Sequence, residues 1–139
     1  MRYLLDTVTL GEPTKVRPDP GVTHWIQTTD PGTKFISILT IAEARRGIAM
    51  LRRRDPNGAA KLVLWLDSQR KLFADRVLPV DDEVAALWGE LNADRTLPVM
   101  DSLIAATALA HDLTLVTRNT RDFAGTGVKL VNPWRHAIR

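Results

Sequence analysis

Four carboxylates occupy positions that an alternating strand–helix chain would bring together. Asp6 ends the apolar run "YLLD", and Asp122 lies in the polar turn "RNTRD" that follows the run "LTLVT". Asp101 opens the alanine-rich helix before "LTLVT", and Glu43 lies in the first turn of the helix expected after a second apolar run. Converging carboxylates repel one another unless a divalent cation neutralises them. Because the ligands are oxygen atoms and the chain has no cysteine, that cation should be Mg²⁺ or Mn²⁺.

Each carboxylate also has a simpler structural interpretation. Asp101 is a good helix N-cap or first-turn residue, and Asp122 is a common turn residue. Glu43 can form an ion pair with Arg46, three residues further along its helix. Asp6 can be a strand-end turn residue, although a charge directly after a buried run needs a partner. The hypothesis of a metal site therefore depends on the four residues as a set.

Short apolar runs alternate with amphipathic segments along the chain. Strands are expected at residues 3–6, 34–39, 76–80 and 114–117, with an edge strand at residues 128–133. Helices are expected at residues 22–28, after a Thr40 cap, at residues 59–73, after Asp81 or Asp82, and after Asp101. This alternation predicts an α/β fold in which a parallel sheet is covered on both faces by helices. Such sheets bind ligands outside the carboxyl ends of their strands, where the four carboxylates would lie.

The composition is that of one ordinary globular domain spanning residues 1–139, with 45% hydrophobic and 25% charged residues. The absence of cysteine excludes a disulfide framework and a thiolate metal site. The longest stretch of apolar and small residues, "LIAATALA", is far shorter than the roughly 20 residues that span a bilayer. We therefore expect a cytoplasmic protein with no membrane partner. The net charge of +3 permits a polyanionic partner without requiring one.

Four segments resemble the PIN-domain toxins of the VapC and FitB type. They are "YLLDT", "LTIAEARRGI", "LPVMDSLIAATALAHDLTLVTRNTRDF" and the closing "VNPW", and together they extend over nearly the whole chain. The third is the most specific, because an acid-led apolar helix, a strand and "TRNxxDF" occur there in order. The resemblance implies a PIN-like three-layer fold, a short parallel sheet flanked by helices on both faces. It also implies an endoribonuclease that depends on Mg²⁺ or Mn²⁺, is paired with an antitoxin protein, and cleaves structured RNA such as tRNA.

The family's acidic cluster, carried over by motif, corresponds to the same four residues of this chain. The catalytic residues would be Asp6, Glu43, Asp101 and Asp122, and the metal ligands among them Asp6, Asp101 and Asp122. Thr117 would support the cluster through its hydroxyl group, and Asn119 would orient a metal-bound water. Family members commonly form homodimers, and we expect the same here.

Arginines are the candidates for contacts with RNA phosphates. Arg118 and Arg121 flank the proposed site, and Arg46 belongs to an arginine-rich helix segment, residues 44–54. The alternative for the helix arginines is a solvated face or a surface for a protein partner. The family favours this alternative, because its corresponding helix lies in the region that meets the antitoxin.

The first motif departs from the family pattern "DTNVL", since Val8 stands where an asparagine is usual and Gly11 replaces a small hydroxyl residue. Valine cannot donate a hydrogen bond beside Asp6. An alternative hypothesis is therefore a catalytically impaired PIN-fold protein that acts mainly through its antitoxin or RNA partner. A dehalogenase-like phosphatase would need a second aspartate at position 8, so the sequence disfavours that class.

Overall fold

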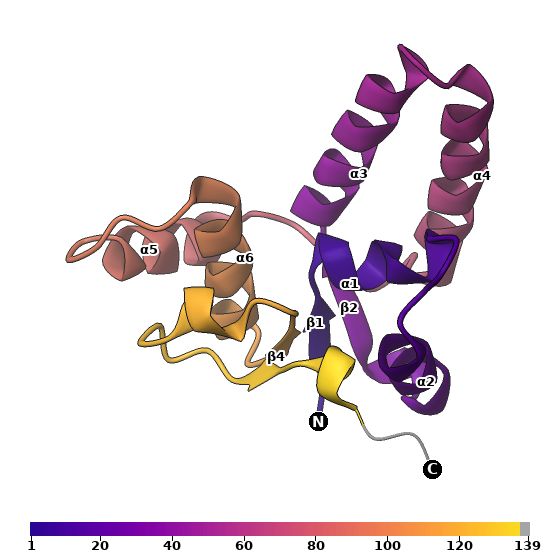
Figure 1. Cartoon of the computed structure of the whole chain (residues 1–139). Helices are drawn as coiled ribbons and strands as arrows, with labels where there is room; N and C mark the ends of the chain where they lie inside the picture. Colours follow the sequence, from indigo (N-terminus) through magenta and orange to yellow (C-terminus); the bar gives the residue numbers. More distant parts are fainter. Residues whose placement is uncertain (137–139) are drawn as a thin grey trace.

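A five-stranded parallel sheet forms the centre of the computed structural model, which describes residues 1–136 (Figure 1). The strands are β1 (Tyr3–Leu5), β2 (Lys34–Ser37), β3 (Val77–Leu78), β4 (Thr114–Val116) and β5 (Leu130–Val131). They lie in the order β3-β2-β1-β4-β5, and every pair is parallel. The predicted α/β fold with a flanked parallel sheet is confirmed. The strands are shorter than expected, because each pairs over only two to four residues.

Within residues 1–136, six α-helices accompany this sheet. They are α1 (Thr7–Gly11), α2 (Pro20–Thr28), α3 (Ile38–Arg52), α4 (Pro56–Leu72), α5 (Asp82–Leu91) and α6 (Val99–Ala110). Helices α3 and α4 pack together as an arm that extends away from the sheet, whereas α5 packs on α6 beside β4 (Figure 1). Within residues 1–136, no helix combines the length and the hydrophobicity needed to cross a membrane.

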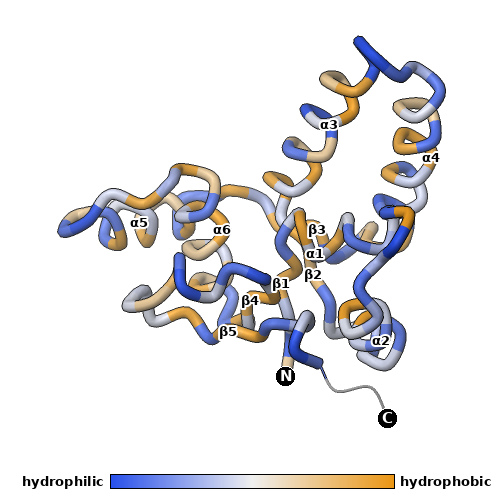
Figure 2. The backbone as a smooth tube through the Cα atoms, in the orientation of Figure 1, coloured by the Kyte–Doolittle hydropathy of each residue, from blue (hydrophilic) through white to orange (hydrophobic). Residues whose placement is uncertain are grey.

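Alternating strand residues build a core on each face of the sheet. Leu4 and Leu115 belong to one buried cluster, and Leu5 and Val116 belong to the other. Neighbouring strand residues point to opposite faces, so a strand buried on both sides is apolar throughout. The hydrophobic colouring of the tube along β1 and β4 contrasts with the hydrophilic tip of the α3–α4 arm (Figure 2). The carboxyl ends of β1 and β4 are therefore held firmly in place.

Four helices begin earlier than the sequence predicted. Helix α2 begins at Pro20 instead of residue 22, and α4 begins at Pro56 instead of residue 59. Thr40 is not the cap of α3, because Ser37 caps it by accepting a hydrogen bond from the Leu39 N–H at 3.0 Å. Helix α6 begins at Val99, directly after Pro98, so Asp101 is its third residue and not its cap. For α5, where two aspartates were candidates, the cap is Asp81, which accepts from the Val84 N–H.

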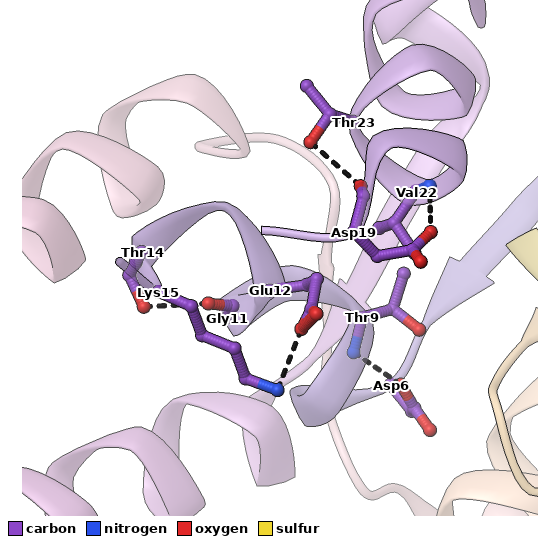
Figure 3. Close-up of polar contacts among 9 residues, drawn as sticks. All are labelled: Asp6, Thr9, Gly11, Glu12, Thr14, Lys15, Asp19, Val22 and Thr23. Carbon is purple, nitrogen blue, oxygen red and sulfur yellow. Dashed lines mark hydrogen bonds and ion pairs between the residues drawn. The ribbon is translucent and has the colours of Figure 1, made fainter. Parts of the chain in front are cut away.

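In the segment between β1 and α2, the three prolines of residues 13–21 predict a loop, and no helix is expected. The segment folds as the short helix α1 followed by a 3₁₀ turn, η1 (Glu12–Thr14). Glu12 is only 4% exposed, and the Lys15 ammonium lies 2.9 Å from its Oε2 (Figure 3). This compact turn leaves Asp6 at the rim of the sheet.

Candidate active site

The strand order reverses direction between β1 and β4. From central β1 the chain moves outward to β2 and β3 on one side, then returns to β4 and β5 on the other. Such a reversal is the topological switch point at which open α/β sheets bind ligands. Asp6 follows β1 directly, and Thr117 follows β4 directly.

Asp6 combines a structural role with a free carboxylate oxygen. Its N–H donates to the Val116 carbonyl at 3.1 Å, which extends the pairing of β1 with β4 by one residue. Its Oδ1 accepts from the Thr9 N–H at 2.8 Å and so caps α1 (Figure 3). The Thr9 hydroxyl donates to the same Val116 carbonyl at 3.0 Å. Oδ2 has no hydrogen-bond or ion-pair partner among residues 1–136, so it remains available to a ligand.

A hydrogen bond from Thr7, the residue after Asp6, orients the Glu43 side chain. The Thr7 hydroxyl donates to Glu43 Oε1 at 2.5 Å, linking the start of α1 to α3. Because α3 begins at Ile38, Glu43 lies in its second turn and not its first. The alternative ion pair with Arg46 is not formed, since no ion pair within residues 1–136 involves Glu43. The structure therefore directs Glu43 toward Thr7, beside Asp6.

The carboxyl group of Asp101 is affected by the negative charges of the other three acidic residues. Its side chain is half-buried in the first turn of α6, and no cap hydrogen bond involves it. The pKa of its carboxyl is raised, first by burial and then by the negative charges of Asp122, Glu43 and Asp6. The fold thus brings the four carboxylates close enough to repel one another.

Asp122 is returned to the rim by a tight turn after β4. The 3₁₀ turn η3 (Thr120–Phe123) contains Asp122, whose N–H donates to the Asn119 carbonyl at 3.1 Å. Thr117 is 1% exposed, and its hydroxyl accepts from the Asn119 N–H at 3.2 Å. The Asp122 and Asn119 side chains are exposed, so both are accessible to a ligand.

The chemistry of this set suits a hard divalent cation. All four side chains offer carboxylate oxygen atoms, and none forms an ion pair with a lysine or arginine in the described part of the chain. Across residues 1–136, however, no three acidic or histidine side chains converge tightly enough to hold an ion as they stand. Cation binding would therefore require side-chain rotation that draws the carboxylates together.

The predicted RNA-binding arginines are placed differently from one another. Arg118 and Arg121 line a pocket of about 240 Å³ that includes Asp122. Arg46 is exposed on α3 and lines no part of that pocket. The sequence analysis missed Arg135, which lines the same pocket from the 3₁₀ turn after β5. No sequence signal could have assigned it, because its position depends on the pairing of β5 with β4.

Comparison with known sequences identifies the family. The PIN domain family model matches residues 3–129. Toxin FitB of Neisseria gonorrhoeae is 35% identical over 139 residues, which cover 94% of this chain and 97% of that protein. VapC ribonuclease Y4jK of Sinorhizobium fredii is 32% identical over 142 residues, which cover 96% of this chain and 99% of that protein.

Solved structures agree with this result. FitAcB from Neisseria gonorrhoeae superposes with a TM-score of 0.90 at 34% identity, over 96% of this chain and 99% of the compared chain. FitAB bound to a DNA fragment superposes with a TM-score of 0.89 at 31% identity, over 99% of each chain. Sequence and fold together show that this chain belongs to the PIN-domain family, among relatives that include Toxin FitB and VapC ribonuclease Y4jK.

Proposed function

We propose that this chain is the toxin of a toxin–antitoxin pair and acts as an endoribonuclease that requires Mg²⁺ or Mn²⁺. The observation that carries the proposal is Asp101, whose half-buried carboxyl faces the charges of three other carboxylates at the switch point of the sheet. The name of FitB as a toxin and of Y4jK as a VapC ribonuclease supports the same assignment. Structured RNA such as tRNA is the proposed substrate.

Three aspartates would hold the cation: Asp6 through its free Oδ2, Asp101 from α6, and Asp122 from the turn after β4. A bound cation would lower the pKa of water and stabilise negative charge on the phosphate. Glu43, whose Oε1 accepts from the Thr7 hydroxyl, would accept a proton at this site. Asp6, Glu43, Asp101 and Asp122 together form the proposed acidic rim. Asn119 would orient the attacking water, and the buried Thr117 fixes the Asn119 backbone. Hydrolysis would leave a 5′-phosphate and a 3′-hydroxyl.

A cognate antitoxin is the proposed protein partner. A groove of about 880 Å³ runs between the α3–α4 arm and the segment after η1. Leu51, Leu62 and Trp65 contribute apolar surface to it, and Lys15, Arg54 and Lys61 contribute positive charge. A partner segment with apolar and acidic side chains would complement this groove. We further propose that residues 1–139 form one PIN domain, which works as a homodimer in the cytoplasm.

A second candidate function follows from Val8, which is 48% exposed in α1 two residues after Asp6. Valine offers no hydrogen bond to a ligand or to a neighbouring carboxylate. In this alternative the chain is catalytically impaired and acts through its antitoxin or RNA partner. The two functions differ in whether the acidic rim binds metal and cleaves RNA.

Cleavage of total cellular RNA by the purified chain, freed of any partner, tests the proposal. Reactions with Mn²⁺, Mg²⁺ and EDTA would run beside the same reactions with Asp101→Asn. Discrete fragments that require metal and disappear in the variant would support the nuclease, and sequencing their ends would name the substrate. A folded protein that cleaves nothing in any reaction would favour the binding protein instead.

A further inference from the structure

Three arginines surround the pocket that adjoins Asp122. The pocket holds about 240 Å³, roughly the volume of eight water molecules, and is open to solvent. Its lining residues are Arg118, Asn119, Thr120, Arg121, Asp122 and Arg135. None of the three guanidinium groups forms an ion pair with a carboxylate among residues 1–136. Three arginines against the single carboxylate of Asp122 leave the lining of the pocket with a formal charge of +2.

Contacts between two chain segments fix the shape of this pocket. The Arg118 guanidinium lies 5.5 Å from the centre of the Trp134 ring, in a cation–π contact. Asn132 Oδ1 accepts from the Trp134 N–H at 3.0 Å, and the Asn132 carbonyl accepts from the Arg135 N–H at 3.2 Å. Asn132 Nδ2 also donates to the Arg118 carbonyl at 3.4 Å. The turn after β5 is therefore tied to the end of β4, which keeps Arg135 opposite Arg118 and Arg121.

We propose that this arginine pocket binds a backbone phosphate of the RNA strand next to the bond that is cleaved. The inference rests on the proposed function and adds a second contact point for its substrate. A planar guanidinium matches the oxygen atoms of a phosphate in a bidentate geometry, and three such groups suit a polyanion. Asp122 belongs to both the pocket and the acidic rim, so a phosphate in the pocket flanks the one at the rim.

The pocket recognises the backbone and not a base. The Trp134 ring is already covered on one face by the Arg118 guanidinium, and the neighbouring His136 ring is stacked on His24. Phosphate contacts position a nucleic acid without reading its sequence. The arginine pocket would therefore set the register of the strand, while the acidic rim performs the cleavage.

Binding of RNA to cleavage-deficient protein tests this assignment directly. In the Asp101→Asn background, a fluorescently labelled single-stranded RNA oligonucleotide would be titrated with protein at several KCl concentrations, with EDTA present. We expect Arg121→Gln and Arg135→Gln to weaken binding several-fold. Each should also reduce the salt slope, the slope of log K for binding against log KCl concentration, by about 0.7, the value for one lost phosphate contact on a single strand. The matched control is Arg70→Gln on the exposed face of α4, which removes the same charge outside this pocket and should leave the slope unchanged.

The result is distinguishable from failure of the proposed function. RNA binding that depends on Arg121 and Arg135, in a chain that never cleaves RNA, would support the pocket and refute the nuclease. Cleavage by the wild-type chain, with salt slopes identical in all three variants, would overturn the pocket and keep the nuclease. If Arg121→Gln and Arg135→Gln instead weakened only the binding of a purified antitoxin, the pocket would belong to the protein partner and the inference would be wrong. Circular dichroism of each variant ensures that a loss of binding is not a loss of fold.

Discussion

The Thr7 hydroxyl donates a hydrogen bond to Glu43 Oε1 at 2.5 Å, and this contact joins two parts of the acidic rim. Thr7 follows Asp6 at the carboxyl end of β1, whereas Glu43 lies in the second turn of α3. A hydrogen bond to a carboxylate fixes the orientation of the acid. Thr7 is therefore a positioning residue that acts through Glu43.

Thr7→Val should lower RNA cleavage about tenfold and leave the fold intact, because the side-chain volume is kept while the donor to Glu43 is lost. Steady-state cleavage of an RNA substrate would show the loss mainly in kcat. Thr7→Ser restores the donor and should recover most of the activity. Equal activities in the valine and serine variants would contradict the role of this hydrogen bond.

Asp101→Asn should stabilise the metal-free protein at neutral pH. Because the pKa of Asp101 is raised in the folded state, the folded chain binds more protons than the unfolded chain once pH exceeds the ordinary aspartate pKa. The stability that protonated Asp101 contributes is present at low pH and is lost as pH rises through the folded-state pKa. Asparagine does not ionise, so the Asp101→Asn variant keeps this stability at pH 7. Thermal unfolding in EDTA should therefore show a melting temperature for the variant a few degrees above that of the wild type.

Two further conditions check this reasoning. The advantage of Asp101→Asn should shrink as pH falls through the raised pKa of the folded-state carboxyl, and it should be gone near the ordinary aspartate pKa of about 3.9. Adding Mn²⁺ should reverse the order, because cation binding stabilises the folded wild type and not the variant. A variant less stable than the wild type in EDTA at neutral pH would mean that Asp101 is not electrostatically strained.

The cap of α5 offers a test of local structure. Asp81→Ala should lower the free energy of unfolding by about 1 kcal/mol, because it removes the acceptor for the Val84 N–H. Asp82→Ala is the matched control: it lies inside the first turn, where a carboxylate interacts only with the helix dipole, and should cost about half as much or less. Urea unfolding measures both. Equal losses in the two variants would contradict the assignment of Asp81 as the cap.

Alanine substitutions at two helical glycines should change the free energy of unfolding in opposite directions. A Cβ at Gly47, on the exposed face of α3, meets nothing within 4 Å, so Gly47→Ala should stabilise the protein by about 0.5–1 kcal/mol. A Cβ at Gly21 would lie 2.9 Å from the Pro133 carbonyl oxygen, so Gly21→Ala should destabilise it by about 1–3 kcal/mol. The two unfolding curves should shift in opposite directions. A shift of both curves the same way would show that α2 does not pack closely against Pro133 in the turn after β5.

The parts of the fold that periodicity encodes could be predicted from the sequence. Runs such as "YLLD" and "LTLVT" indicated buried parallel strands because strands covered on both faces are apolar throughout. Asp6 and Asp122 were expected at one rim of the sheet because each follows such a strand. Helix starts were less predictable, since Ser37, Thr40, Asp81 and Asp82 are all acceptable caps. The choice among them depends on where the preceding strand stops pairing.

Features that depend on tertiary contacts could not be predicted. Helix α1 is only five residues long and is stabilised by Asp6 and by the Thr9–Val116 hydrogen bond, so it leaves no periodic signal. The contact between Thr7 and Glu43 joins residues 36 positions apart, and Arg135 reaches its pocket only through the pairing of β5 with β4. The roles of Asp6, Glu43, Asp101 and Asp122 in catalysis stay a prediction.

The central claim is that these carboxylates form one site for a divalent cation, and calorimetric titration of Mn²⁺ into the purified chain tests it most directly. We predict saturable binding to the wild type that weakens at least tenfold in Asp6→Asn, Asp101→Asn and Asp122→Asn. Asp112→Asn, at the opposite end of α6 from Asp101, is the control and should bind as the wild type does. Folded wild-type protein that binds no Mn²⁺, or binds it equally in Asp101→Asn, would contradict the account.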